Sequence, residues 1–313
     1  MSLSYRSVRN SALLLAALGL AACGGADEEA FSLAFVATDG AAEVDCETAM
    51  SGLGPDGAHS VGLSDLRFYV SNLQLWDADG EEVPVTLDEN DFQYAGETGW
   101  VGLIDLTSNS AGDCVATAIT SSEGTQRTNA AITGEAAVED VASVTFDVGV
   151  PQALMQEVIN ATSAEAAPSP LDEMYWSWAT GYRHIVFNMT VSDGAEDGEG
   201  YLHVGSKNCS ADGELALENQ DVCEYLNTPK VALDDFDLAN DTVAIDLPSM
   251  MEGLDFVVPI YDSKTMEVIG EQVGAACHSS PSEPHCAPVH ANLGIDMETG
   301  DADAADNAVF SVY

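Results

Sequence analysis

Six histidines are the side chains with the widest chemical range in this chain of 313 residues. Neutral imidazole is a good ligand for copper in either oxidation state and for zinc. The six are His59, His184, His203, His278, His285 and His290. A single histidine on a strand is more often a hydrogen-bonded structural residue than a ligand. Residue type alone therefore leaves the choice of ligand open.

The densest aromatic segment covers residues 174–182 and reads MYWSWATGY. Two of the chain's four tryptophans, Trp176 and Trp178, stand one residue apart in it. Aromatic clusters of this kind are common packing anchors, so burial in a core is the plain interpretation. We place the centre of the protein here, with a strand predicted directly after it at residues 183–191.

Cysteine pairing is the next chemical constraint. An even number of cysteines in an exported protein indicates disulfides. Besides Cys23, the chain has Cys46, Cys114, Cys209, Cys223, Cys277 and Cys286. Local pairing predicts the bonds Cys209–Cys223 and Cys277–Cys286 and leaves Cys46–Cys114, although spacing alone does not select among the 15 connectivities that six cysteines allow. His278 and His285 adjoin cysteines as in a zinc site, but an oxidised cysteine is not a ligand, so we favour the disulfide.

The first residues resemble an export signal. Arg6 and Arg9 precede a short apolar run at residues 12–20, which is too short to span a bilayer as a mature helix. Leu-Ala-Ala before Cys23 is typical of a bacterial lipobox, although an ordinary signal peptide is the alternative. We predict a signal peptide over residues 1–22, a lipidated tether over 23–30, and a periplasmic protein held at the outer membrane only by lipid on Cys23.

The charge balance is strongly acidic, with 53 Asp and Glu against 8 Lys and Arg. Nucleic acid is excluded as a partner because its phosphates would be repelled. Such a surface attracts cations or a basic partner, but adaptation to a salty habitat explains most of these carboxylates. A hydrophobic content of 46% is ample for a core.

Short strands separated by turns dominate the rest of the pattern. Residues 141–150 alternate clearly, with Val144, Phe146 and Val148 on one face. Further strands are predicted at 31–37, 66–75, 83–87, 201–204, 230–233, 242–247 and 308–312, and short helices at 151–159 and 249–254. This pattern predicts an all-β fold, a mainly antiparallel β-sandwich or barrel-like domain with a few short helices, as a single domain over residues 31–313.

Acidic segments at 77–82, 193–199 and 301–306 resemble calcium loops in composition only. None has the spacing of an EF-hand, so we predict solvated hairpin turns. The chain also lacks the motifs of the common hydrolases and nucleotide-binding proteins.

Several ordered motifs together resemble one family. Residues 66–72 (LRFYVSN), 146–151 (FDVGVP), 169–171 (SPL), 174–182 and 201–209 (YLHVGSKNC) match segments of the MbnP/CorA-like copper-binding proteins of the metallo-mystery pair system. Their order is kept over most of the chain, which makes the set specific although each motif alone is weak.

The remaining features of the four-Cys pattern are also present. Cys223, Cys277 and Cys286 complete the pattern that begins at Cys209. The chain departs from the family at His184, where a bulky apolar residue is more usual.

The resemblance implies a function and a set of site residues. A partner di-haem enzyme, an MbnH/MauG-like peroxidase-type protein, would oxidise Trp176 or Trp178 to kynurenine, and we favour Trp176. The product would then help histidine to bind copper. His203 is the first candidate ligand because it lies in a matched motif, His59 precedes the first matched strand, and His290 follows.

We therefore predict a copper-binding lipoprotein that captures or handles copper at the cell envelope and is not an enzyme. Electron holes would travel through Trp178, Tyr175 and Tyr182 during the oxidation. The alternatives are a small metal redox protein and a structural or adhesive, disulfide-stapled lipoprotein whose aromatic cluster is only core.

Overall fold

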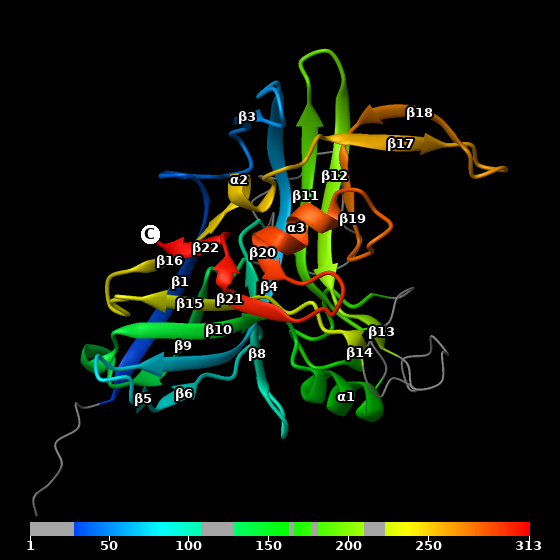
Figure 1. The fold of residues 1–313 in the computed structure, drawn as a ribbon. Helices are drawn as coiled ribbons and strands as arrows, with labels where there is room; N and C mark the ends of the chain where they lie inside the picture. Colours follow the sequence, from blue (N-terminus) through cyan, green and yellow to red (C-terminus); the bar gives the residue numbers. More distant parts are fainter. Residues whose placement is uncertain (1–27, 108–127, 163–165, 177–180, 210–222) are drawn as a thin grey trace, which may run out of the picture.

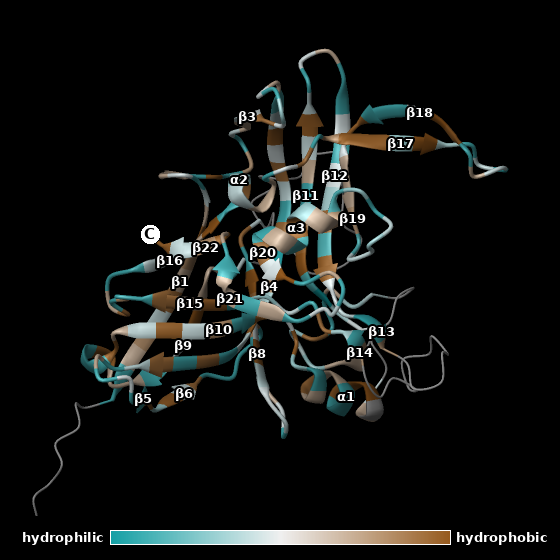
Figure 2. Ribbon diagram, in the orientation of Figure 1, coloured by the Kyte–Doolittle hydropathy of each residue, from teal (hydrophilic) through white to brown (hydrophobic). Residues whose placement is uncertain are grey.

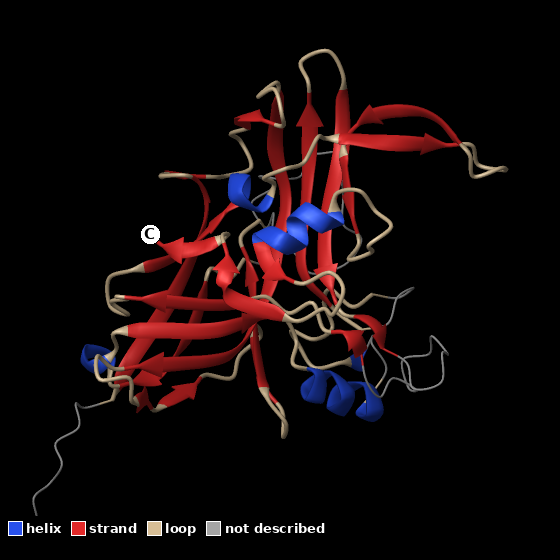
Figure 3. Cartoon of the chain, in the orientation of Figure 1, coloured by secondary structure: helices blue, strands red, loops and turns tan. Residues whose placement is uncertain are grey.

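The chain folds as two β-sheets packed face to face, with few helices (Figures 1 and 3). The computed structural model describes residues 28–107, 128–162, 166–176, 181–209 and 223–313. This architecture confirms the predicted all-β class, and it includes parallel as well as antiparallel pairs.

The smaller sheet has six strands. Its order is β22-β16-β1-β9-β6, and β2 pairs with the last two residues of β1. The bounds are β1 (Glu29–Asp39), β2 (Ala42–Glu43), β6 (Val85–Leu87), β9 (Ala131–Ala136), β16 (Thr242–Asp246) and β22 (Phe310–Val312).

The larger sheet has ten strands and is built along β4, which runs from His59 to Trp76. Its main order is β15-β10-β4-β11-β12-β19, and β3, β5 and β8 also pair with β4, while β7 pairs with β8. The other bounds are β3 (Met50–Leu53), β5 (Glu82–Val83), β7 (Gln93–Ala95), β8 (Trp100–Asp105), β10 (Ser143–Val148), β11 (Arg183–Ser192), β12 (Asp197–Gly205), β15 (Lys230–Asp234) and β19 (Ala275–Cys277).

Three two-stranded sheets complete the strands that the structure describes. They pair β13 (Lys207–Cys209) with β14 (Cys223–Tyr225), β17 (Val257–Tyr261) with β18 (Val268–Val273), and β20 (Leu293–Ile295) with β21 (Ala302–Asn307). The β17–β18 hairpin projects from the body of the molecule (Figures 1 and 2). Met266, Val268 and Ile269 are exposed on it.

The helices are short. They are α1 (Gln152–Ala161), α2 (Leu247–Met250), α3 (Cys286–Asn292) and the 3-10 helix η2 (Val138–Asp140). Pro151 precedes α1, where its fixed φ suits a helix start, and Leu154 and Val158 of α1 pack into a hydrophobic cluster. Among the described residues, none of the helices has the length and apolar character needed to cross a bilayer.

Side chains alternate between two hydrophobic clusters on opposite faces of the larger sheet. On β11, Ile185 and Phe187 join the main core, while Val186 joins a second cluster that includes residues of α1. Phe35 of the smaller sheet lies with its ring centroid 5.6 Å from that of Phe68 in the larger sheet, so the main core lies between the two sheets. We refer to the opposite face of the larger sheet, the one bearing Val186, as the outer face.

Most strand predictions are confirmed with shifted ends, and one of the three turn predictions is wrong. Residues 193–196 connect β11 to β12 as a hairpin turn, as predicted for 193–199, although residues 197–199 already belong to β12. Residues 302–306 lie in β21, although the segment is acidic. Exposed strand positions accept charged side chains, so acidic composition alone does not identify a turn.

Candidate functional site

Strand register places three aromatic or imidazole rings together on the outer face. Leu202 of β12 pairs with Cys277 of β19, and both belong to the main core. Side chains alternate along a strand, so Tyr201, His203 and His278 point to the other face. The ring centroids of His203 and His278 are 5.2 Å apart, and those of Tyr201 and His278 are 4.5 Å apart.

Trp176 completes this cluster. Its side chain is only 2% exposed, and its ring centroid lies 6.5 Å from that of His203 and 6.1 Å from that of His278. The Trp176 amide donates a hydrogen bond of 3.2 Å to the carbonyl of Gly181, which has a φ of +96°. The backbone therefore turns at Gly181 and holds Trp176 against the start of β11.

His203 presents one ring nitrogen without a hydrogen-bond partner. Its Nε2 lies 2.8 Å from Oδ1 of Asn188, whereas its Nδ1 is inaccessible to solvent and has no partner. Burial, followed by the charges of Arg183, His278 and Arg67, holds the pKa of His203 well below its usual range. The ring is therefore neutral at neutral pH and carries one lone pair.

His278 is oriented by a carboxylate. Its Nδ1 lies 3.0 Å from Oε1 of Glu283, and its backbone amide donates to Oε2 of the same residue. Burial opposes ionisation of Glu283, but the hydrogen bonds from His278 outweigh it and lower the pKa of Glu283. Since Nδ1–H donates to the carboxylate, the lone pair of the neutral ring lies on Nε2.

Lys207 covers the indole. Its Nζ lies 4.3 Å from the centroid of the Trp176 ring, within the range of a cation–π contact. Burial lowers the pKa of Lys207, and the charge of Glu283 partly offsets that effect. The cluster thus combines an indole, two imidazoles, a phenol and an amine.

Comparison with known proteins gives a consistent family. The family model described as MbnP matches residues 28–269 of this chain. The chain belongs to the MbnP family. A solved structure, MbnP from Methylosinus trichosporium, is similar with a TM-score of 0.68 and 25% sequence identity, covering 91% of this chain and 98% of that chain. No curated protein sequence gives a significant match.

Two predicted disulfides of this MbnP-family chain are confirmed. Cys209 is bonded to Cys223 and Cys277 to Cys286. Cys46 is also disulfide-bonded, and Cys114, its predicted partner, lies outside the described residues.

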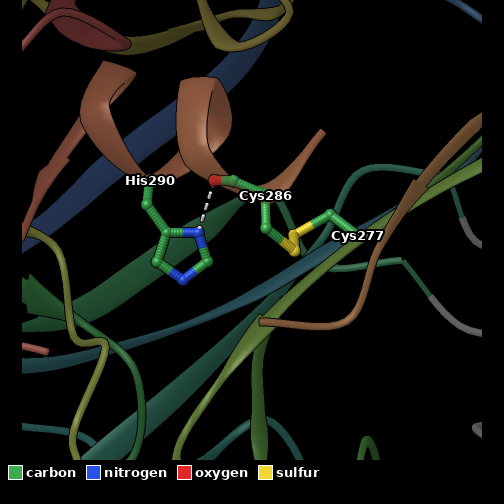
Figure 4. Close-up of side chains that lie close together, drawn as sticks. All are labelled: Cys277, Cys286 and His290. Atoms are coloured by element: carbon green, nitrogen blue, oxygen red, sulfur yellow. Dashed lines mark hydrogen bonds between the residues drawn. A yellow bond between two sulfur atoms is a disulfide. The ribbon is translucent and has the colours of Figure 1, made fainter. Parts of the chain in front are cut away.

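The Cys277–Cys286 disulfide lies beside His290 (Figure 4). Their ligand atoms lie within 4.8 Å of one another, the one such group of three among the residues that the structure describes. Nδ1 of His290 lies 2.9 Å from the carbonyl of Cys286, and Nε2 has no hydrogen-bond partner. Because both sulfurs are in the disulfide, neither is a thiolate, and the group lacks the ligands of a zinc site.

The structure does not bring His59 or His290 to Trp176. His59 begins β4, eight residues before Arg67, which is in register with His203 through Val186. At about 3.3 Å per residue, His59 lies roughly 25 Å along β4 from Arg67, and so from the position of His203 across the sheet. His290 contacts the disulfide on the core side of β19.

Two other histidines have both ring nitrogens in hydrogen bonds. His184 accepts from the amide of Val150 and donates to the carbonyl of Leu226. His285 accepts from the amide of Ala276 and bonds Asp255 at 2.8 Å. Both are therefore structural residues. At His184, where the family usually has an apolar residue, the imidazole forms hydrogen bonds within the core.

Trp178 and Cys23, like Cys114, lie outside the described residues. Of the predicted relay, Tyr175 and Tyr182 have ring centroids 5.7 Å apart.

Sequence reasoning missed His278, Glu283 and Lys207 as parts of the cluster. A usable signal was present for His278, because it directly follows Cys277 and so takes the opposite face of the strand. Glu283 lies in the loop that the Cys277–Cys286 bond closes, and its contact with His278 is local.

Proposed function

We propose that this MbnP-family chain binds one copper ion through oxidised Trp176, His203 and His278. The main support is the convergence of two histidine rings on one buried indole, on a single face of the sheet. Imidazole nitrogen is a suitable ligand for copper. In this proposal the copper ion is bound and takes part in no reaction.

The residues fit such an ion. Nδ1 of His203 is a buried lone pair without a hydrogen-bond partner, which is costly unless a ligand uses it. The Nδ1–H of His278 donates a hydrogen bond to the carboxylate of Glu283, the carboxylate–histidine arrangement that commonly orients metal ligands. Ring centroids 5.2 Å apart are compatible with two imidazoles sharing one ion.

Intact Trp176 cannot be the third ligand, because the indole N–H only donates. Cleavage of the C2–C3 bond of the indole by two equivalents of hydrogen peroxide gives N-formylkynurenine and two molecules of water. Hydrolysis of the formyl group then releases C2 as formate and leaves the ring nitrogen as the aryl amine of kynurenine. That amine has a lone pair for a soft metal. In this proposal the di-haem, peroxidase-type MbnH/MauG-like partner enzyme catalyses the oxidation with hydrogen peroxide as the oxidant, and Trp176 is its target rather than Trp178.

We further propose a periplasmic location, with lipid on Cys23 anchoring the protein to the outer membrane. The role would be copper capture or handling at the cell envelope, without catalysis by this chain.

The decisive experiment couples mass spectrometry with copper titration. Protein co-expressed with the di-haem enzyme should gain about 4 Da at residue 176, the change from Trp to kynurenine, and Trp176→Phe should abolish this gain. His203→Ala and His278→Ala should each weaken copper binding by more than the roughly 10–100-fold typical of outer-shell changes. His59→Ala is the matched control and should leave the affinity unchanged.

Other outcomes select other functions. Unmodified tryptophan and no copper after co-expression would favour the structural lipoprotein. Loss of copper in His59→Ala but not in His278→Ala would move the site to the start of β4. Turnover of the bound ion with an electron donor would favour the redox protein.

A further inference from the structure

Two neighbouring rows of side chains cross the outer face from β4 to β12, and His203 ends the first of them. In the first row, Arg67 of β4, Val186 of β11 and His203 of β12 are in register. In the second row, Asn188 of β11 is in register with Asp65 and Tyr201. Directly opposed side chains on neighbouring strands lie within contact distance, so Asn188 is placed between Asp65 of β4 and the strand β12 that carries His203.

The amide of Asn188 has only one orientation that satisfies both neighbours. Its Nδ2 donates to Oδ2 of Asp65 at 3.4 Å, and Arg67 binds the same Asp65 carboxylate at 2.7 and 2.9 Å. An ionised carboxylate is only an acceptor, so the amide must turn its NH2 group toward Asp65 and its oxygen toward His203.

The tautomer of His203 follows from that orientation. An amide oxygen 2.8 Å from Nε2 requires the proton on Nε2, which leaves the lone pair on Nδ1. Nδ1 is the buried nitrogen without a hydrogen-bond partner.

The far end of the same network reaches the segment that carries Trp176. Nη1 of Arg67 lies 3.4 Å from Oε2 of Glu173, and both side chains are buried. Tyr69 on the same strand donates to the carbonyl of Glu173 at 2.7 Å. The histidine and the tryptophan are therefore tied to one buried hydrogen-bond network.

We propose that Asn188 is a positioning residue that fixes His203 as the Nε2–H tautomer and so makes Nδ1 the metal-binding nitrogen. This inference rests on the proposed copper function for its consequence. The tautomer itself is a property of the metal-free chain.

The first test needs no variant of Asn188. The 15N NMR spectrum of the metal-free chain at neutral pH, with the His203 signals assigned by their loss in His203→Gln, should show a protonated Nε2 and an unprotonated Nδ1. A protonated Nδ1 in the unaltered protein overturns the inference.

The second test compares matched variants on β11. Asn188→Leu removes the acceptor, so the two 15N signals of His203 should move toward each other and copper affinity should fall roughly 10–100-fold. Asn188→Asp keeps an oxygen for Nε2–H and should retain the tautomer. Thr190→Val removes a polar group from the same face of β11, two residues further along the strand from His203. It should change neither the 15N signals of His203 nor the copper affinity.

The outcomes separate the inference from the function on which it rests. If copper binding depends on His203 but Asn188→Leu binds as tightly as Thr190→Val, Asn188 has no positioning role. If the unaltered protein binds no copper after co-expression with the di-haem enzyme, the copper proposal fails. The NMR spectrum of the metal-free chain still decides whether His203 is the Nε2–H tautomer.

Discussion

At the scale of the residue, the six histidines divide by what their nitrogens contact. His184 and His285 use both nitrogens in hydrogen bonds, whereas His203 keeps Nδ1 unpartnered beside Trp176. This division follows from tertiary neighbours such as Asn188, which lies fifteen positions away in the sequence. Residue type therefore identifies candidates, and hydrogen bonding removes His184 and His285. His290 also keeps an unpartnered nitrogen, so the position beside Trp176 is what selects His203.

The buried His184 should make stability depend on pH. Burial lowers the pKa of His184 to about 4, below the value near 6.5 of an unfolded chain, so the unfolded state binds the proton more tightly. The stabilisation is complete above pH 6.5 and is lost as pH falls toward 4, with a loss of about 2 kcal/mol at pH 5. His184→Gln keeps an acceptor and a donor and should reduce the pH-dependent loss in urea unfolding between pH 7 and 5 by that amount.

Comparison with the variant is needed because another buried group has the opposite effect. Burial raises the pKa of Asp105 to about 7 despite the charge of Arg67, so protonation of Asp105 stabilises the fold as pH falls. An identical pH dependence in the parent and His184→Gln would contradict the assignment of a neutral, buried His184.

At the scale of the element, the site depends on one backbone turn and one strand pair. The segment that carries Trp176 forms backbone hydrogen bonds with Gly181 and Arg183, and the parallel pairing of β12 with β19 places His278 beside His203. Parallel pairing joins segments that are far apart in the sequence, so the order of strands along the chain does not predict it.

Replacing Gly181 should disturb this turn. A Cβ on Gly181 would collide with Oγ of Ser206 and meet Sγ of Cys209 at 3.1 Å, and the φ of +96° is strained for any L side chain. Gly181→Ala should lower the free energy of unfolding by about 1–3 kcal/mol and alter the fluorescence of the tryptophans.

The matched control for that change is Gly194→Ala. Gly194 has a φ of +84° but no atom within 4 Å of an added Cβ, so it reports the backbone strain without the collision. Equal losses of stability in the two variants would show that the contact with Ser206 is unimportant.

At the scale of the whole molecule, the scarce cations gather at the site. The described residues contain five Lys and Arg, and three of them, Arg67, Arg183 and Lys207, contact the segment that carries Trp176. Arg183 donates to the carbonyls of Met174 and Tyr175, both at 3.2 Å. The whole chain carries a formal net charge of −45, so most of its carboxylates have no cation to compensate them.

That imbalance should make stability depend on salt. Mutual repulsion of surface carboxylates opposes compaction, and raising NaCl from about 0.01 to about 1 M shortens the Debye length from roughly 30 to roughly 3 Å. The thermal midpoint should therefore rise with salt. A midpoint that is constant or falls over this range, measured by circular dichroism at neutral pH, would show that the charges are not destabilising.

The sequence by itself determined the all-β class and the family, and local pairing predicted the two disulfides that the structure confirms. Alternating strands such as β10, ordered motifs and closely spaced cysteines are all short-range signals. Only the tertiary structure decided which histidines meet Trp176: His278 instead of His59 or His290. The physical reason is that side-chain direction alternates with every residue, so a pairing register between distant strands decides which rings share a face.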